Sequence, residues 1–413
     1  MAALAALVVV AAGCERIANS TPERRLQRRV ARLLPSIERN TGLRFKREPR
    51  VEPRTSAEVR RFVEAGFRES RAARDLAGYE LAYKMFGLLP PKLSLRKILL
   101  DLLEEQVAGF YDPKTKALYV VTDMPSSTLD VTVAHELVHA LQDQYVNLDS
   151  LRQAEVDNDR ATAAQAAVEG HATYVSMLGL AKAEDLASVP GGWATIAAGI
   201  REQSTTAAGL GAAPDAVREG LIFPYAAGLP FVAAGYASRP GAGIVSDAPH
   251  STEQVLHPNA YREPRDEPTQ VGLPALAGAT VRYENTLGEF ETRLVLSEQL
   301  RDTVVAFRAA AGWDGDRYAV VALPDGGEGL VWATVWDTPA DADDFRGQLA
   351  AAYTRRYRIE AGALSAGRGS AGGRSVSIAA TTVDGRPVVV LSDLPTDAAM
   401  APLDPARVTL GQR

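Results

Sequence analysis

Two histidines separated by three residues most constrain the fold that this chain can adopt. The segment VAHELVHALQDQ holds His135 and His139 four positions apart, with Glu136 between them. On an α-helix, side chains four positions apart lie one turn above each other on the same face. Both imidazoles can then reach a single metal ion, while the Glu136 carboxylate projects beside it. The motif therefore predicts a helix that carries part of a metal site.

Zinc suits this motif, because a catalytic zinc site has three protein ligands and one open position for water. The metal lowers the pKa of that water, and Glu136 can then take its proton as the general base. The chain contains a single cysteine, Cys14, so both a disulfide framework and a multi-cysteine zinc site are excluded. The structural alternative is a pair of solvated or core-satisfied histidines without a metal.

The third ligand must come from a later segment. In the metzincin pattern a glycine and a third histidine would follow, but Gln142 and Tyr145 occupy those positions. Glu169 lies thirty residues after His139, in the Ala- and Val-rich segment AAVEGHA of the next predicted helix. A reversal between two antiparallel helices would bring Glu169 to the metal, which would supply the partner that a buried carboxylate needs. His171 is the rival ligand on another face of that helix, and an exposed glutamate is the structural alternative.

Hydrolysis also needs a donor for the negative charge that develops on the attacked carbonyl oxygen. Tyr225 in FPY and His257 in LHP are the candidates, and a structural role is the alternative for each. Gln142 and Asp143 could hold the predicted metal-binding helix in place through hydrogen bonds, without contacting the metal themselves. A solvated helix face is the alternative.

Composition bounds the remaining possibilities. The chain has 413 residues, of which 46% are hydrophobic and 23% are charged, so we expect two globular domains and a leader. The net charge of −6 means that acidic residues outnumber basic ones, which argues against a nucleic-acid partner. The sequence leaves the oligomeric state open.

The first 14 residues resemble a secretion leader. An apolar run of small residues precedes Cys14 and is too short to span a bilayer as a helix. Small residues followed by cysteine are similar to a bacterial lipoprotein cleavage site, although no Lys or Arg precedes the run. We therefore expect an extracytoplasmic protein that is anchored to the membrane through a lipidated Cys14, or that is secreted. A frayed apolar terminus is the alternative.

The periodicity of the chain divides it into segments. Residues 15–55 read as a tether and a first helix, residues 56–265 as one domain, and residues 276–413 as a smaller α+β domain. Residues 107–111 and 117–121 are β-like runs joined by the turn sequence DPKTK, which predicts a β-hairpin. Helices are predicted at 23–39, 57–73, 93–105, 127–145, 160–180 and 191–207.

The C-terminal unit has a different sequence pattern, in which most of the predicted elements are strands. Strands are predicted at 318–323, 330–335, 375–380 and 387–391, with a helix at 340–356. Residues 262–275 contain three prolines and read as a linker, and the Gly-, Ser- and Ala-rich residues 361–374 read as a mobile loop. The segment GWDGDR at 312–317 could suggest calcium, but the full loop pattern is missing and a turn is the better interpretation.

HExxH followed by a glutamate on a later helix resembles the gluzincin branch of zincin metallopeptidases. The segments HALQDQ, VEGxA, GFYDPKT, FPYAAGLPFV and STEQVLHPNAY are similar to uncharacterised bacterial envelope proteins regarded as metallopeptidases. This resemblance covers about residues 99–261. It implies a mainly helical, zincin-like catalytic domain with a small β-hairpin, followed by the smaller α+β domain. It also implies Zn²⁺ bound by His135, His139 and Glu169. An edge strand, 107–111 or 117–121, could then pair with the substrate backbone, and a plain structural hairpin is the alternative.

Three functions remain open from the sequence. The first is zinc-dependent hydrolysis of peptide bonds in a peptide or protein substrate, with Glu136 as the general base. The second is a non-catalytic, zinc-binding envelope lipoprotein that acts as an interaction module. The third is a zinc amidase for a non-peptide amide. A structural zinc site needs no general base, so the presence of Glu136 favours catalysis.

Overall fold

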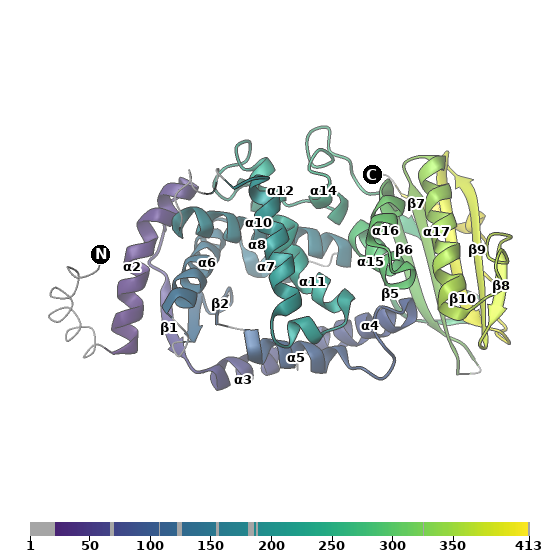
Figure 1. Cartoon of the computed structure of the whole chain (residues 1–413), viewed down its shortest axis with the longest axis horizontal. Coiled ribbons are helices and arrows are strands. Elements are labelled where there is room, and N and C mark those ends of the chain that lie inside the picture. Colours follow the sequence, from purple (N-terminus) through teal and green to yellow (C-terminus); the bar gives the residue numbers. More distant parts are fainter. Residues whose placement is uncertain are drawn as a thin grey trace, which may run out of the picture.

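The chain forms an elongated α+β structure in two parts, as the sequence predicts (Figure 1). The computed structural model describes residues 21–66, 70–106, 108–121, 126–153, 157–180, 186, 189–324 and 326–411. The predicted leader and Cys14 lie outside these residues. None of the helices described is long and apolar enough to cross a membrane.

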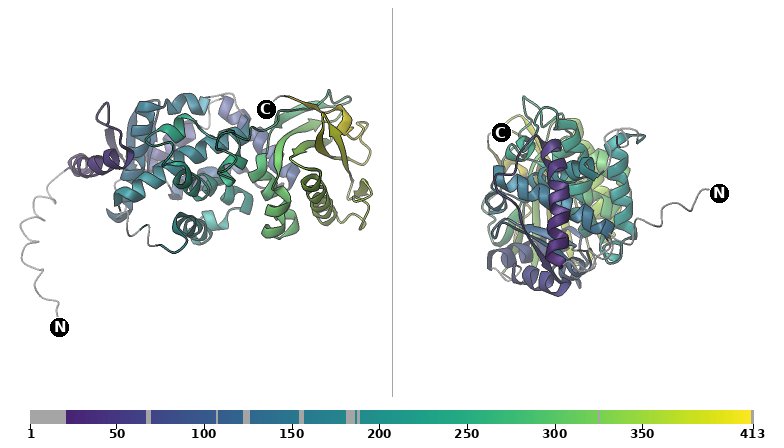
Figure 2. Two further views of the ribbon diagram at one scale, coloured as in Figure 1. Left: turned by 90° about the horizontal axis from the view of Figure 1, so that it is seen from above. Right: turned by 90° about the vertical axis from the view of Figure 1, so that its left-hand side faces the viewer.

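The first part is mainly helical. Its helices are α2 (Pro22–Thr41), α3 (Ser56–Gly66), α4 (Ser70–Phe86), α5 (Leu95–Gln106), α6 (Ser126–Tyr145), α7 (Leu148–Gln153), α8 (Asn158–Leu180), α10 (Gly192–Thr206), α11 (Asp215–Ala226), α12 (Gly228–Gly235), α13 (Gly243–Ser246) and α14 (Thr252–Leu256). A 3₁₀ turn, η1, spans Leu210–Ala212. Helix α2 lies across one end of the molecule, where it packs against α6 (Figure 2).

Local chemistry explains where α2 begins and ends. The Thr21 hydroxyl accepts a hydrogen bond from the backbone N–H of Arg24, which caps the first turn. Gly42 has a φ of 70° and ends the helix in the left-handed conformation that glycine adopts most readily. The buried residues of α2 recur every three or four positions and include Leu26, Val30, Leu33 and Ile37. This apolar face packs on the core that also contains α6, the helix that carries His135 and His139.

A three-stranded sheet lies beside α6. Its strands are β1 (Arg50–Arg54), β2 (Gly109–Asp112) and β3 (Ala117–Val121), in the order β1-β3-β2. β2 and β3 form the predicted hairpin, whereas β1 pairs with β3 in parallel. Because β3 has a partner on both sides, 117–121 is not an edge strand. Of the two predicted edge strands, only β2 lies at an edge of this sheet. Val107, the first residue of the predicted edge strand, lies outside the described residues.

The second part contains a six-stranded sheet in the order β5-β6-β7-β10-β9-β8, in which all neighbours are antiparallel. Its elements are β4 (Val271–Gly272), β5 (Thr280–Asn285), α15 (Gly288–Leu300), α16 (Thr303–Ala310), β6 (Trp313–Ala322), β7 (Glu328–Trp336), α17 (Pro339–Tyr357), β8 (Arg368–Ala371), β9 (Arg374–Val383), β10 (Arg386–Pro395), η2 (Pro405–Arg407) and β11 (Thr409–Leu410). α15, α16 and α17 lie together on one side of this sheet (Figure 1).

One hydrophobic core joins the two parts. Phe86, at the end of α4, is fully buried and meets the rings of Tyr318 and Trp332 edge-on, with centroids 5.2 and 5.3 Å apart. Further along the same core, the rings of Phe223 in α11 and Phe290 in α15 stack at 4.0 Å. Aromatic pairs in these geometries contribute about 0.5–1.5 kcal/mol beyond the area they bury. The helical part is therefore packed onto the C-terminal sheet through large buried side chains.

Helix α15 is buried along most of its length although it carries several charges. Residues 288–296 are all buried, including Glu289, Glu291 and Arg293. Glu291 accepts hydrogen bonds from the hydroxyls of Tyr79 and Tyr83, the second at 2.8 Å. These bonds come from α4, so the polar contacts of α15 also tie the two parts together.

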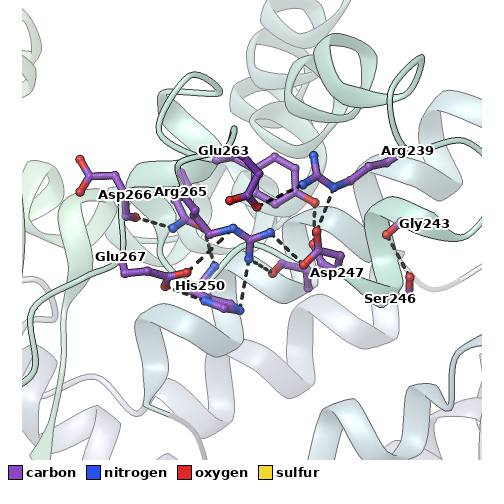
Figure 3. Close-up of polar contacts among 12 residues, drawn as sticks. Arg239, Gly243, Ser246, Asp247, His250, Glu263, Arg265, Asp266 and Glu267 are labelled. Atoms are coloured by element: carbon purple, nitrogen blue, oxygen red, sulfur yellow. Dashed lines mark hydrogen bonds and ion pairs between the residues drawn. The ribbon is translucent and has the colours of Figure 1, made fainter. Parts of the chain in front are cut away.

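The predicted linker at 262–275 is held by ion pairs and a short strand, β4. Arg265 pairs with Asp247 at 2.8 Å and lies 4.7 Å from the centre of the Tyr261 ring (Figure 3). His250 pairs with Glu267 at 2.7 Å in the same network. This segment therefore follows one defined path between the two parts.

Two predictions for the C-terminal part are wrong. Residues 361–374 contain β8, which pairs with β9, so they form an ordered hairpin instead of a mobile loop. The segment 312–317 begins β6, with a bulge between Trp313 and Gly315, so it is not a turn. Asp316 accepts hydrogen bonds from the indole N–H groups of Trp313 and Trp332, which give this acidic residue a structural role.

Candidate metal centre

Helices α6 and α8 bring three predicted ligands together. His135 Nε2 lies 3.1 Å from His139 Nε2 and 3.1 Å from Glu169 Oε2. His139 Nε2 lies 3.2 Å from the same carboxylate oxygen. The helix pair that the spacing predicts is thus present, with the short helix α7 in the connection.

The spacing of these three atoms fits a zinc ion. Ligand atoms at about 2.0–2.1 Å from a tetrahedral zinc are about 3.3 Å from one another. The observed separations of 3.1, 3.1 and 3.2 Å are close to the edges of such a tetrahedron. Two imidazole nitrogens and one carboxylate oxygen are also a donor set typical of catalytic zinc.

The electrostatics of the three ligands also favour a positive charge between them. Burial lowers the pKa of His139, but the adjacent Glu169 carboxylate outweighs burial and raises this pKa to about 9. Burial acts to raise the pKa of Glu169, but His139 and His135 hold it well below its usual range. A proton meets this preference near neutral pH, and a metal ion bound at these atoms would have to displace it.

Gln142 orients the His139 ring through a hydrogen bond to Nδ1, the nitrogen that is not part of the ligand triangle. Its side chain is 1% exposed, and its Nε2 donates to the carbonyl oxygen of Val168 at 2.9 Å, which fixes the direction of the amide. The Gln142 Oε1 must then accept from His139 Nδ1, at 2.8 Å. With the proton on Nδ1, the lone pair of His139 Nε2 points to the ligand triangle, as a metal ligand requires.

His171 lies in this supporting network and outside the ligand triangle. Its Nδ1 is 2.9 Å from Gln142 Nε2, which donates to it, and the residue is buried. Burial lowers the pKa of His171 to about 4, so the ring is neutral. Gln142 therefore separates His171 from His139, and the geometry favours Glu169 over His171 as the third ligand.

Glu136 lies beside the triangle and contacts the edge strand. Its Oε2 accepts a hydrogen bond of 2.7 Å from the backbone N–H of Tyr111 in β2. One carboxylate oxygen of Glu136 is within 4.8 Å of ligand nitrogens of both His135 and His139. Burial raises the pKa of Glu136, although the two histidines oppose the shift. A raised pKa is what a carboxylate general base needs to operate near neutral pH.

Asp143 anchors α6 to its surroundings. It accepts hydrogen bonds from the Tyr111 hydroxyl and the Lys116 ammonium, both at 2.7 Å, and from the backbone N–H of Leu148 at 3.1 Å. These contacts fix α6 to the β-hairpin and to the start of α7. Asp143 thus acts on the helix as a whole, whereas Gln142 contacts His139, a predicted ligand, directly.

The two candidate oxyanion donors lie in different environments. The ring of Tyr225 in α11 is 6.0 Å from the ring of His135, so Tyr225 borders the metal centre. His257 follows α14, and its Nε2 lies 3.0 Å from Glu289 Oε1 and 3.1 Å from Arg293 Nη2. None of the contacts described for His257 is with a predicted metal ligand. The geometry therefore favours Tyr225 and disfavours His257.

Sequence reasoning missed a backbone contact next to Glu169, the predicted third ligand. A β-carbon added to Gly170 would lie 2.3 Å from the carbonyl of Gly228, and one added to Gly228 would lie 2.2 Å from the carbonyl oxygen of Ala166. Helices α8 and α12 therefore touch through their backbones at the residue that follows Glu169. The glycine in VEG was the available signal, because glycine inside a helix is costly unless something must approach closely.

A family model matches the C-terminal part of the chain. It is described as a domain of unknown function (DUF8575), and the matched residues are 278–403. No curated protein and no solved structure gives a significant match. The matched region follows the metal centre in the chain and contains none of its residues, so the resemblance of residues 99–261 to zincins stays a prediction.

Proposed function

We propose that this protein is a zinc-dependent peptidase in which His135, His139 and Glu169 hold the metal. The observation that carries the proposal is the triangle of ligand atoms, whose edges match those of a zinc tetrahedron. Zinc bound there supplies a Lewis acid that polarises a carbonyl group and lowers the pKa of water.

The side chains around the triangle have complementary tasks in hydrolysis. Glu136 takes the proton from the attacking water and passes it on to the leaving amine. Its hydrogen bond from the Tyr111 N–H holds the carboxylate in place but leaves the second oxygen for the proton. Tyr225 is the donor for the charge that develops on the attacked carbonyl oxygen.

The outer edge of β2 favours a peptide as the substrate. β2 pairs with β3 on one side only, and the Tyr111 N–H points away from β3 towards Glu136. An extended peptide that adds to this edge would bring its backbone carbonyl groups alongside the general base. A non-peptide amide would lack these backbone contacts, which is why the peptidase is preferred to an amidase.

The proposal is tested by separating metal binding from hydrolysis. Glu136→Gln should keep about one zinc per chain while cleavage of a peptide library falls by about 10²–10⁴-fold, because only the base is lost. Glu169→Ala should lose both zinc and cleavage. Zinc content is measured by atomic emission after dialysis, and cleavage by mass spectrometry.

Glu202→Gln is the matched control, since Glu202 is exposed in α10 and should affect neither quantity. If Glu169→Ala keeps full zinc affinity, the third ligand is misassigned and His171 is the next candidate. If the wild-type protein binds zinc but cleaves no peptide in the library, the non-catalytic interaction module is the better description.

A further inference from the structure

A cavity lies where the helical part meets the C-terminal part. It is lined by residues of α10 and α11 from the first part and of α15 and α16 from the second, and its volume is about 440 Å³. Small-molecule sites in proteins usually measure about 300–1,000 Å³. His135, His139 and Glu169 are not among its lining residues, so the cavity is separate from the candidate metal centre.

Part of the cavity wall is apolar. Phe223 of α11 and Phe290 of α15 are buried and stack on each other with their ring centroids 4.0 Å apart. Leu294 and Phe307 also line the cavity. The side chain of Phe307 is 45% exposed, so an apolar ligand in the cavity would remove part of this ring from water. The wall therefore suits a ligand with a hydrocarbon or aromatic body.

The charged part of the wall favours an anion. Of the described residues that line the cavity, three are carboxylates and four are arginines, namely Arg201, Arg218, Arg293 and Arg301. The lining thus carries one positive charge in excess, and Glu289, which pairs with Arg293, is not among the lining residues. Arg218 is 13% exposed, whereas its partner Asp215 is 60% exposed. Because water screens an exposed carboxylate, Asp215 offsets the charge of Arg218 only in part.

Two hydrogen-bond donors of the lining residues are buried without an acceptor. Arg218 uses its Nη2 for Asp215 at 2.7 Å, but its Nε has no partner among the described residues. Ser297 of α15 has a buried hydroxyl that likewise has no partner within the part of the chain that the structure describes. Native proteins seldom leave buried donors without an acceptor from the protein, from water or from a ligand. The two donors come from helices of different parts, and both residues line the same cavity.

We propose that this cavity binds a small organic carboxylate with an apolar body, such as a medium-chain fatty acid. The two carboxylate oxygens accept from Arg218 Nε and Ser297 Oγ, and the hydrocarbon packs against the phenylalanine rings. Hydrogen bonds between arginine and a carboxylate are about twice as strong as those between neutral groups. A single negative charge also balances the excess charge of the lining, which a dianionic phosphate would exceed.

The bound carboxylate would contact both parts of the chain. It would contact α11 through Arg218 and α15 through Ser297, so it bridges the two parts beside the stacked rings of Phe223 and Phe290. A ligand that binds only the folded state raises the free energy of unfolding. This inference does not depend on the zinc centre or on peptidase activity.

Calorimetric titration of the full chain with decanoate, below the concentration at which it forms micelles, tests the proposal. About one decanoate should bind per chain. Decanol has the same hydrocarbon chain without the charge, and it should bind at least about tenfold more weakly because the charged hydrogen bonds are lost. Butanoate keeps the carboxylate but lacks six methylene groups, so it should bind at least about 100-fold more weakly.

Variants assign the binding to these side chains. Arg218→Met and Ser297→Ala should each weaken decanoate binding about tenfold, because each removes one donor to the carboxylate. Ser297→Ala removes a single oxygen, so it tests the proposal even if Arg218→Met fails to fold. Arg346→Met is the matched control, since Arg346 pairs with Asp343 at the same three-residue spacing but does not line the cavity. Decanoate binding should persist in Glu169→Ala, which lacks a proposed ligand of the zinc centre.

Three results would overturn the proposal. The first is a wild-type protein that shows no saturable binding of decanoate, or that binds decanol as tightly, because the carboxylate would then have no site. The second is decanoate binding that is unchanged in Ser297→Ala and in folded Arg218→Met. The third is binding that disappears in Glu169→Ala, because the carboxylate would then be acting as a ligand of the zinc ion.

Discussion

Replacing Gly170 by alanine should force apart two helices that touch through their backbones beside the metal centre. The added β-carbon would lie 2.3 Å from the carbonyl carbon and oxygen of Gly228 and 2.8 Å from its α-carbon. Carbon atoms in ordinary contact are about 3.5–4.0 Å apart, so α12 would have to move from α8 by more than about 1 Å. No side-chain rotation can relieve the overlap, because all three atoms belong to the backbone.

Two opposing contributions set the size of the effect. Alanine stabilises a helix interior by about 0.5–1 kcal/mol relative to glycine. Overpacking a well-packed interior costs about 1–3 kcal/mol, and a rigid obstacle places this change near the upper limit. We therefore expect Gly170→Ala to lower the free energy of unfolding by about 2 kcal/mol. Because Glu169 is the adjacent residue, zinc affinity should fall as well, by about tenfold or more.

Gly199→Ala is the matched control for this prediction. Gly199 also lies inside a helix, α10, but a β-carbon there would meet no atom within 4 Å. This variant should therefore gain about 0.5–1 kcal/mol from helix propensity alone. Urea unfolding followed by circular dichroism gives both values, and competition with a chelator gives the zinc affinity. If Gly170→Ala is stabilised as much as Gly199→Ala, the close approach of α8 and α12 is refuted.

Three further predictions concern the metal centre and α15. Gln142→Leu should weaken zinc binding by about 10–100-fold in a chelator competition, because His139 loses the acceptor that orients it; unchanged affinity would show that the ring is held by other contacts. Tyr225→Phe should lower kcat by about 10²–10³-fold at constant zinc content, and a variant that keeps more than about a third of wild-type kcat would exclude Tyr225 as the donor. Burial raises the pKa of Glu291 from 4.5 to about 7, so the native state holds an extra proton between these values. Its contribution to stability is complete below pH 4.5 and is lost as the pH rises through 7. Glu291→Gln should flatten this part of the pH–stability curve by roughly 3 kcal/mol, and an unchanged curve would contradict the shift.

The sequence predicted the features that depend on local periodicity. The spacing of His135 and His139 required a helix, and the apolar pattern around Glu169 required a second helix that could return to it. The DPKTK turn between two β-like runs predicted the hairpin β2–β3. In each case the elements are neighbours in the chain, so their pairing needed no knowledge of distant segments.

Features that depend on distant partners were missed. β1 has the sequence RVEPR, which is charged and contains proline, and it forms a strand because β3 offers a parallel partner. Helix α15 lacks the usual amphipathic pattern, and its buried charged side chains contact residues that are distant in sequence. Glu291 accepts a hydrogen bond from Tyr83 of α4, and Glu289 pairs with His257. The Gly-rich residues 361–374 looked mobile, but β9 provides a template on which β8 pairs.

The contact of Phe86 with the C-terminal sheet has a consequence for how this protein evolved. The family match begins at residue 278, but the aromatic face of Tyr318 and Trp332 is covered by a helix that ends near residue 86. The boundary of the family match therefore divides residues that share one hydrophobic core. A relative that inherited only the matched region would have to obtain a substitute for α4 elsewhere, from its own flanking sequence or from a second subunit, because such a surface is rarely left exposed to water.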